Sequence, residues 1–233
     1  MLAQAMQYLN QNRILHIDMI EPLRRGSGSI LRAGTDGVLI FDRLAALYLV
    51  SAETAPAAAE MAALMTEPKL AAAHQEHTAK TLAEIFGLRR TMCCYQAMWD
   101  LSVPPAVPES DLELRLLTPD LEAEILSNYS HDIGRDYIRG RILAGEMTGA
   151  FDDGELAGFI GLHEEGSMGM LEVKPAYRRR GIASLLLASL SASQLALGRI
   201  PFSQFVRDNI QSRKLHEQLG FTISNECVYW LER

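Results

Sequence analysis

The C-terminal half of the sequence alternates between short apolar segments and longer stretches of helical character. The alternation of apolar and polar residues predicts strands over residues 112–117, 148–151, 156–162, 168–173 and 202–206, and further strands over 221–231. Helices are expected from Thr118 to about Leu143, after Gly181, and from Asp208 or Asn209 to Gly220. Strands and helices that alternate in this way predict the α/β class, with a mixed sheet.

The N-terminal half shows a similar pattern. Strands are predicted over residues 36–41, 46–50, 69–73 and 91–99, with a helix over 78–86. The two halves are separated by residues 102–110, where three prolines in nine residues favour an extended linker. We therefore expect an N-terminal α/β domain over 1–108 and a second domain over 109–233.

A weak internal similarity relates the two halves. When residues 202–231 are shifted back by 133 positions, Leu215, Glu217, Gly220 and Cys227 fall on identical residues. Residues 51–68 contain neither a glycine nor a basic loop, unlike the matching part of the second half. The N-terminal half is thus either a degenerate repeat that has lost an anion site, the interpretation that we favour, or an unrelated α+β domain.

Composition limits the classes of function. Of the 233 residues, 48% are hydrophobic and the net charge is −7, which disfavours a general nucleic-acid binder. No apolar run is long enough to span a membrane, and the first residues lack the features of a secretory signal. The three cysteines have neither metal-ligand spacing nor an even count for disulfides. We expect a cytoplasmic protein without a metal.

The most informative segment is VKPAYRRRGIASLLL, from Val173 to Leu187. A strand leads through a proline-containing turn into three arginines, a glycine and a leucine-rich helix. The first amides of a helix have no intrahelical acceptors, and the helix dipole adds positive charge there. Gly181 lets the backbone approach an anion, and the arginines can donate to phosphate oxygens. The segment predicts a pyrophosphate site.

The chain from about Leu112 to Arg233 resembles the GNAT acyltransferase superfamily in two separated motifs. One is Arg178 to Ala183, and the other runs from Val206 to Asn209 and continues as Leu215 to Phe221. The resemblance implies acetyl transfer from acetyl-CoA, the acyl donor substrate, to an amine. It also implies that the backbone of the strand holds the pantetheine arm, that the loop amides hold the pyrophosphate, and that one side chain contacts CoA. These cofactor-binding positions are Leu171, Glu172, Val173, Arg178, Arg179, Arg180, Gly181, Ile182, Ala183, Ser184 and Asn209.

The position of the general acid departs from the family pattern. Many members carry a tyrosine where this chain has His216, and a histidine can donate a proton near neutral pH. Alternatively, His216 is a partly exposed helix residue and another group protonates the thiolate. Tyr229 and Cys227 are weaker candidates, because a residue on a strand is more often part of the packing.

Candidates for the base are acidic. Glu165, within the segment His163-Glu164-Glu165, precedes the strand that leads into the loop, and Glu172 lies on that strand. A carboxylate there can accept the proton of the amine directly or through a water. The alternative for Glu164 and Glu165 is a solvated hairpin tip.

The sequence is compatible with three functions. The first is an N-acetyltransferase that acts on an amine of a small molecule or peptide. The second is a non-catalytic acyl-CoA-binding or sensing protein, which would retain the loop without the tyrosine acid. The third, a nucleic-acid-associated protein that uses the arginines, is disfavoured by the acidic net charge. We expect acetyl-CoA and an amine as ligands, no nucleic acid or membrane, and a monomer or homodimer.

Overall fold

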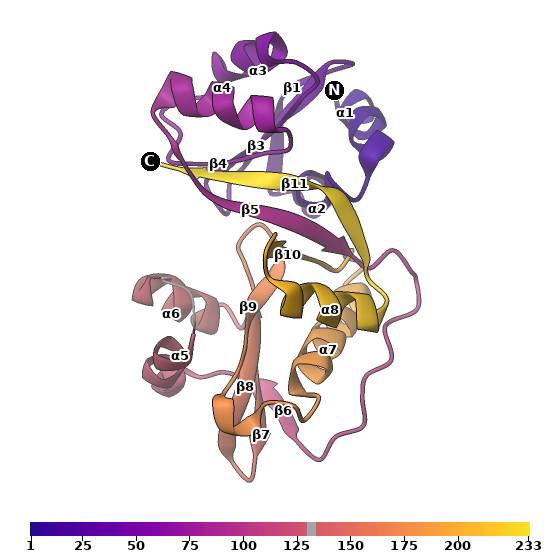
Figure 1. The fold of residues 1–233 in the computed structure, drawn as a ribbon, viewed down its shortest axis with the longest axis vertical. Helices are drawn as coiled ribbons and strands as arrows, with labels where there is room; N and C mark the ends of the chain where they lie inside the picture. Colours follow the sequence, from indigo (N-terminus) through magenta and orange to yellow (C-terminus); the bar gives the residue numbers. More distant parts are fainter. Residues whose placement is uncertain (130–133) are drawn as a thin grey trace.

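The computed structural model describes residues 1–129 and 134–233. Its elements alternate between helices and strands along both halves of the chain (Figure 1). The N-terminal half contains α1 (Leu2–Leu9), α2 (Ile17–Arg25), β1 (Gly28–Gly34), β2 (Gly37–Asp42), β3 (Leu47–Ala52), α3 (Ala55–Ala62), β4 (Leu70–Ala73), α4 (Glu76–Phe86) and β5 (Arg89–Met98). The C-terminal half contains β6 (Glu113–Leu116), α5 (Glu122–Asn128), α6 (Arg135–Leu143), β7 (Met147–Asp152), β8 (Glu155–Leu162), β9 (Met168–Val173), α7 (Ile182–Ala196), β10 (Phe202–Val206), α8 (Ile210–Leu219) and β11 (Thr222–Glu232). The α/β class with a mixed sheet is confirmed.

One sheet runs through both halves, in the order β1-β2-β3-β4-β11-β5-β10-β9-β8-β7-β6. The last strand of each half lies inside the other half: β11 pairs with β4, and β5 pairs with β10, while β5 and β11 pair with each other. Figure 1 shows these two long strands crossing the middle of the molecule. The two halves therefore share a central ladder, and the linker between β5 and β6 runs from the middle of the sheet to the edge strand β6.

Most predicted elements are present, with three differences. The chain before residue 36 forms α1, α2 and β1, which the pattern did not indicate. The single helix expected up to Leu143 is divided into a short 3₁₀ turn, α5 and α6, and the part of that prediction over residues 130–133 lies outside the described residues. Residues 221–231 form one irregular strand, because β11 changes register against β5 between Ile223 and Cys227.

The two parallel strand pairs of the sheet differ in a way that positions the site. In the N-terminal half, β3 and β4 pair over three successive residues, and the side chain of Gln75 bonds to the amide of Ala52 and the hydroxyl of Ser51. In the C-terminal half, β9 and β10 pair at Met168 and Ser203 and then part. The gap between parallel strands is closed in one half and open in the other.

A buried network of polar side chains connects α2 and the end of β4 in the N-terminal half with β10 and β11. The carboxylate of Asp18 accepts from Nε2 of His74 at 2.7 Å and from the Gln204 amide at 3.1 Å, and Gln204 in turn accepts from the indole N–H of Trp230 at 2.6 Å. Nδ1 of His74 faces the Val50 carbonyl at 3.0 Å, so both ring nitrogens face acceptors. Burial favours the neutral ring, but the Asp18 charge outweighs it and raises the pKa of His74.

The neighbouring His16 behaves in the opposite way and gives the first prediction. Burial, followed by repulsion from His74, lowers the pKa of His16 to about 4. The unfolded chain takes up a proton near pH 6.5 while the folded chain does not, so stability falls between pH 6.5 and about 4. We expect His16 to contribute about 1.4 kcal/mol of this loss per pH unit. Urea unfolding of wild type and His16→Asn from pH 7 to 4.5 should show a shallower slope for the variant; parallel slopes would contradict the assignment.

Candidate functional site

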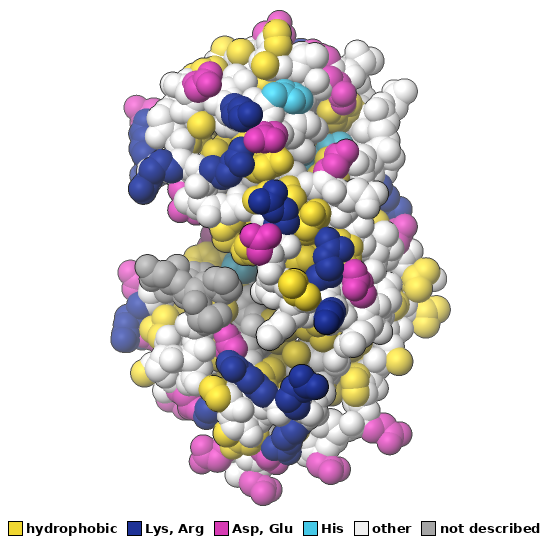
Figure 2. Space-filling model, viewed as in Figure 1, with side chains coloured by type: hydrophobic (Ala, Val, Ile, Leu, Met, Phe, Trp, Pro, Cys, Tyr) yellow, Lys and Arg dark blue, Asp and Glu magenta, His cyan; other side chains and the backbone are white. Residues whose placement is uncertain are grey.

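The opening between β9 and β10 forms the floor of a cleft of about 540 Å³. In β9, Met170 has a φ of +50°, and pairing with β8 shifts register between Phe159 and Gly161. This bend turns β9 away from β10, so the edge of β9 that includes Leu171 faces the cleft rather than a strand. Figure 2 shows the hollow between the two lobes, with a histidine side chain visible in it.

The predicted phosphate loop lies at the N-terminus of α7, after β9. Gly181 is the N-cap residue with a φ of +77°, and no side chain caps the helix. The amides of residues 179–184 donate to no acceptor among the residues that the structure describes. A Cβ at Gly181 would meet no atom within 4 Å, so the space in front of the helix is open. In the N-terminal half, by contrast, Thr54 caps α3 by accepting from the Ala57 amide.

The three loop arginines have different partners. Arg178 donates to the Val173 carbonyl and pairs with Glu172 at 3.4 Å, and Arg180 pairs with Asp152 at 2.7 Å. Arg179 has a φ of +66° and makes no ion pair among the described residues. Figure 2 shows basic side chains gathered over the start of α7, in agreement with an anion site. Glu172 is thus paired with Arg178 at the loop; it is not among the residues that line the cleft, although its charge, second to burial, helps to raise the pKa of the cleft residue Tyr129.

His216 lies inside the cleft and is only 3% exposed, so it is not a partly exposed helix residue. Its ring stacks on Phe205 and meets Phe221 edge-on. Nδ1 lies 2.8 Å from the Ser212 carbonyl, to which it donates, and Nε2 is buried without a partner among the described residues. Burial lowers the pKa of His216, so at neutral pH the ring is neutral and Nε2, with its lone pair, is a hydrogen-bond acceptor.

The acidic candidate Glu165 lies on the other side of the cleft. It is 6% exposed and accepts from the hydroxyl of Ser167, so it is not a solvated hairpin tip. Beside it, the Tyr137 hydroxyl lies 2.8 Å from Nδ1 of His163. Burial raises the pKa of Tyr137 and lowers that of His163, so the phenol donates to a neutral imidazole.

Asn209 is the N-cap residue of α8 and lies at the cleft. Its side chain accepts from the Ser212 amide at 2.9 Å, which is the capping bond that the sequence indicated, and it also lines the cleft. The structure therefore brings Leu171, Glu165, Asn209 and His216 together around one space, with the α7 loop at the end of β9.

Sequence reasoning missed part of the cleft. Tyr129 and Tyr137 come from the α5–α6 region, and burial raises the pKa of Tyr129 to about 12. The wall opposite includes Leu70 and Met92 of the N-terminal half and Trp230 of β11. Nothing local in the sequence marks Met92 and Trp230, because they reach the site only through the pairing of β5 and β11 across the two halves.

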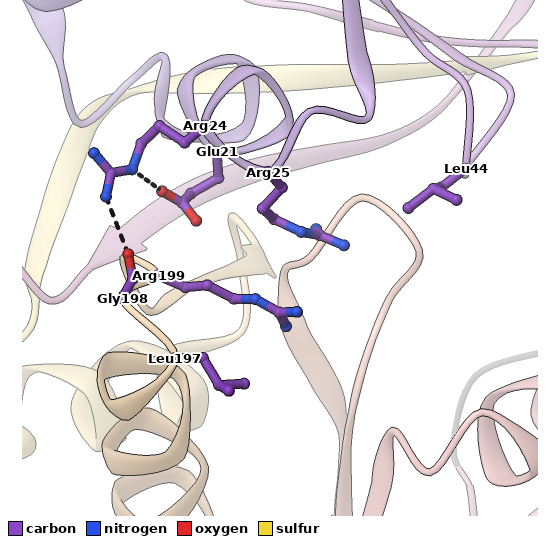
Figure 3. Close-up of a pocket in the computed structure, with 7 residues that line it drawn as sticks. All are labelled: Glu21, Arg24, Arg25, Leu44, Leu197, Gly198 and Arg199. Atoms are coloured by element: carbon purple, nitrogen blue, oxygen red, sulfur yellow. Dashed lines mark hydrogen bonds and ion pairs between the residues drawn. The ribbon is translucent and has the colours of Figure 1, made fainter.

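A second pocket, of about 530 Å³, lies where the two halves meet (Figure 3). Arg24 of α2 bridges the halves: it pairs with the buried Glu21 at 2.8 Å and donates to the Gly198 carbonyl at 3.0 Å. Arg25 and Arg199 also line this pocket. Because Arg24 is already committed to protein partners, this pocket serves as an interface between the halves.

Residues 145–231 match the family described as FR47-like protein. The fold resembles a Drosophila protein of 19% identity (TM-score 0.67, covering 94% of this chain and 88% of that one) and a GCN5-related N-acetyltransferase from Kribbella flavida of 12% identity (TM-score 0.59, covering 95% and 94%). A GCN5-related N-acetyltransferase-like protein from Streptococcus suis, 16% identical, covers 99% of this chain and 100% of that one with a TM-score of 0.54. No curated protein matches the sequence.

The fold of this chain is shared with solved structures of GNAT acetyltransferases, and the family-model match lies within its C-terminal half. The resemblance stated from the two motifs is thereby confirmed, and the fold is one that acyltransferases use. The GNAT likeness of the solved structures extends over nearly the whole chain, so both halves belong to the common fold. No helix in the described ranges is long and apolar enough to cross a membrane.

Proposed function

We propose that the protein is an N-acyltransferase that moves an acetyl group from acetyl-CoA to an amine. The observation that carries this proposal is the parting of β9 and β10, which leaves an open strand edge that leads to the uncapped N-terminus of α7. An open edge suits the amides of a pantetheine arm, and the free amides of residues 179–184 suit a pyrophosphate. Gly181, without a Cβ, leaves room for that group.

The reaction needs a proton balance that the cleft can provide. The amine nitrogen forms a bond to the thioester carbonyl carbon, the carbon–sulfur bond breaks, and the amine loses the proton that the sulfur gains. Glu165 is the proposed base on one side of the cleft. His216, neutral and with its Nε2 free, acts as an acid only after it has received a proton there, so we assign it a relay role toward the sulfur. Glu172 contributes its backbone and holds Arg178.

The role of His216 gives a prediction. Phenylalanine retains the ring contacts with Phe205 and Phe221 but has no Nε2, so His216→Phe should lower kcat about 100-fold while leaving the Kd for acetyl-CoA within about twofold. His216→Tyr, which restores the residue of many family members, should retain more activity than His216→Phe. Because the pKa of His216 is lowered, the wild-type rate should fall only as pH drops below about 6.5. Equal kcat in His216→Phe and wild type would remove the residue from the chemistry.

The test of the proposal is calorimetric titration with acetyl-CoA and with free CoA, followed by an amine panel with thiol detection across pH. Micromolar binding and release of free thiol on addition of an amine would support the transferase. Binding without turnover of any amine would favour a non-catalytic acyl-CoA-binding protein, the second candidate, which the replacement of the family's tyrosine by His216 favours. No binding by the wild-type protein would exclude both.

A further inference from the structure

We propose that the acceptor is a cationic amine with an apolar body and no carboxylate group. This proposal rests on the proposed function, because it assigns the acceptor end of the same cleft. Among the described residues that line the cleft, three are glutamates and none is lysine or arginine. The glutamates are Glu164, Glu165 and Glu232. A low-dielectric space with carboxylates and no cation favours an ammonium group and opposes an anion.

Arg25 and Arg141 each donate to a backbone carbonyl near the cleft wall but do not line the cleft. Arg25 donates to the carbonyl of Glu164 but its side chain lines the second pocket between the halves (Figure 3). Arg141 donates to the Leu162 carbonyl and lies 4.0 Å from Glu146. A carboxylate that entered the cleft would therefore find no guanidinium among the described lining residues to pair with, and it would face Glu164 and Glu165.

Two buried polar atoms in the cleft lack partners and call for a ligand. Nε2 of His216 and the hydroxyl of Ser203, each on a residue 3% exposed, have no hydrogen bond within the described part of the chain. His216 donates its Nδ1 proton to the Ser212 carbonyl, so Nε2 of the neutral ring can only accept a hydrogen bond. Its partner must therefore be an N–H or O–H donor. Leaving such atoms unpaired costs free energy that a bound donor recovers. An amine meets the requirement of His216, whereas a carboxylate does not; the Ser203 hydroxyl can bond to either group.

The side chains of the cleft wall favour an acceptor amine with an apolar substituent. Met92 and Leu70 of the N-terminal half and Met168 of β9 are apolar, and the indole N–H of Trp230 is already occupied by Gln204 at 2.6 Å. An apolar substituent on the amine would contact these side chains. The N-terminal half and the exchanged strand β11 thus supply the surface that determines which acceptor fits.

The test compares phenethylamine with phenylalanine, which share a body and differ by the carboxylate. We expect wild type to acetylate phenethylamine with a kcat/KM at least tenfold higher. Glu232→Lys, which places a cation in the lining, should reduce that ratio at least threefold, whereas Glu155→Lys, exposed at the start of β8, should leave it unchanged. Equal or higher activity with phenylalanine in the wild-type enzyme would overturn the proposal.

A binding readout separates this proposal from the transferase assignment. Each amine is titrated calorimetrically into the protein saturated with free CoA, which cannot react. Tighter binding of phenethylamine than of phenylalanine, without turnover of either with acetyl-CoA, would retain the acceptor class while rejecting catalysis. If the protein acetylates other amines but binds phenylalanine more tightly than phenethylamine, the transferase assignment stands and the proposed acceptor class is rejected. Binding of neither amine would overturn it as well.

Discussion

Gly181→Asp is expected to weaken acetyl-CoA binding at least 100-fold, about 3 kcal/mol. Gly181 sits at the N-cap of α7 with a φ of +77°, and the six amides that follow Arg178 are without acceptors among the described residues. An aspartate there would accept from those amides itself, as N-cap carboxylates do, and would repel the pyrophosphate. The expected loss of affinity has two causes: the loop amides are no longer free to donate to the pyrophosphate, and the new carboxylate repels it at short range.

The measurement is calorimetric titration of acetyl-CoA, with Gly87→Asp as the matched control. Gly87 has a φ of +68°, its Cβ would also meet no atom within 4 Å, and it lies at the end of α4 in the N-terminal half. The control carries the same backbone strain and the same added charge, so it should bind as wild type does. Equal binding by Gly181→Asp and wild type would show that the pyrophosphate is held elsewhere. Arg180→Glu should also weaken binding, because it adds a negative charge beside the same amides.

Asp18→Ala is expected to lower the free energy of unfolding by about 3–5 kcal/mol, since it removes one partner of a buried ion pair. Asp18 and His74 are 0% and 1% exposed, and Asp18 also accepts from Gln204. The pKa of His74 is raised by this pairing, so the stabilisation is fully present below about pH 6.5 and is lost as pH rises through the folded pKa. The difference between wild type and variant should therefore be greatest near pH 6 and smaller at pH 9.

Urea unfolding at several pH values measures this difference. Asp100→Asn is the control, because Asp100 pairs with Arg13 at 3.2 Å with both side chains about half exposed, and it should change stability by less than about 1 kcal/mol. A loss that does not shrink with rising pH would show that packing, not the ion pair, explains the effect. Since Gln204 and Trp230 line the cleft, the variant should also bind acetyl-CoA or amines less well at temperatures where it stays folded.

The parts of the site that are built from consecutive residues could be predicted from the sequence. The loop from Arg178 to Ser184 could be predicted because a strand, a glycine and a helix N-terminus suffice to specify free amides at one point. The cap at Asn209 and the C-terminal glycine Gly220 could be predicted for the same reason. The alternation of apolar residues indicated most strands, because period-two patterning is a local property.

Only the tertiary structure decided how the halves combine. The sequence determined a GNAT-type half and a second half of similar element order, but β5 and β11 could pair within their own halves or across them, and both arrangements satisfy the same apolar pattern. The exchange depends on contacts between residues far apart in the chain. It is this exchange that brings Trp230 and Met92 to the cleft, and long-range packing that buries His216 and leaves its Nε2 unpaired. Burial, and with it pKa and accessibility, is a property of the assembled core rather than of any segment.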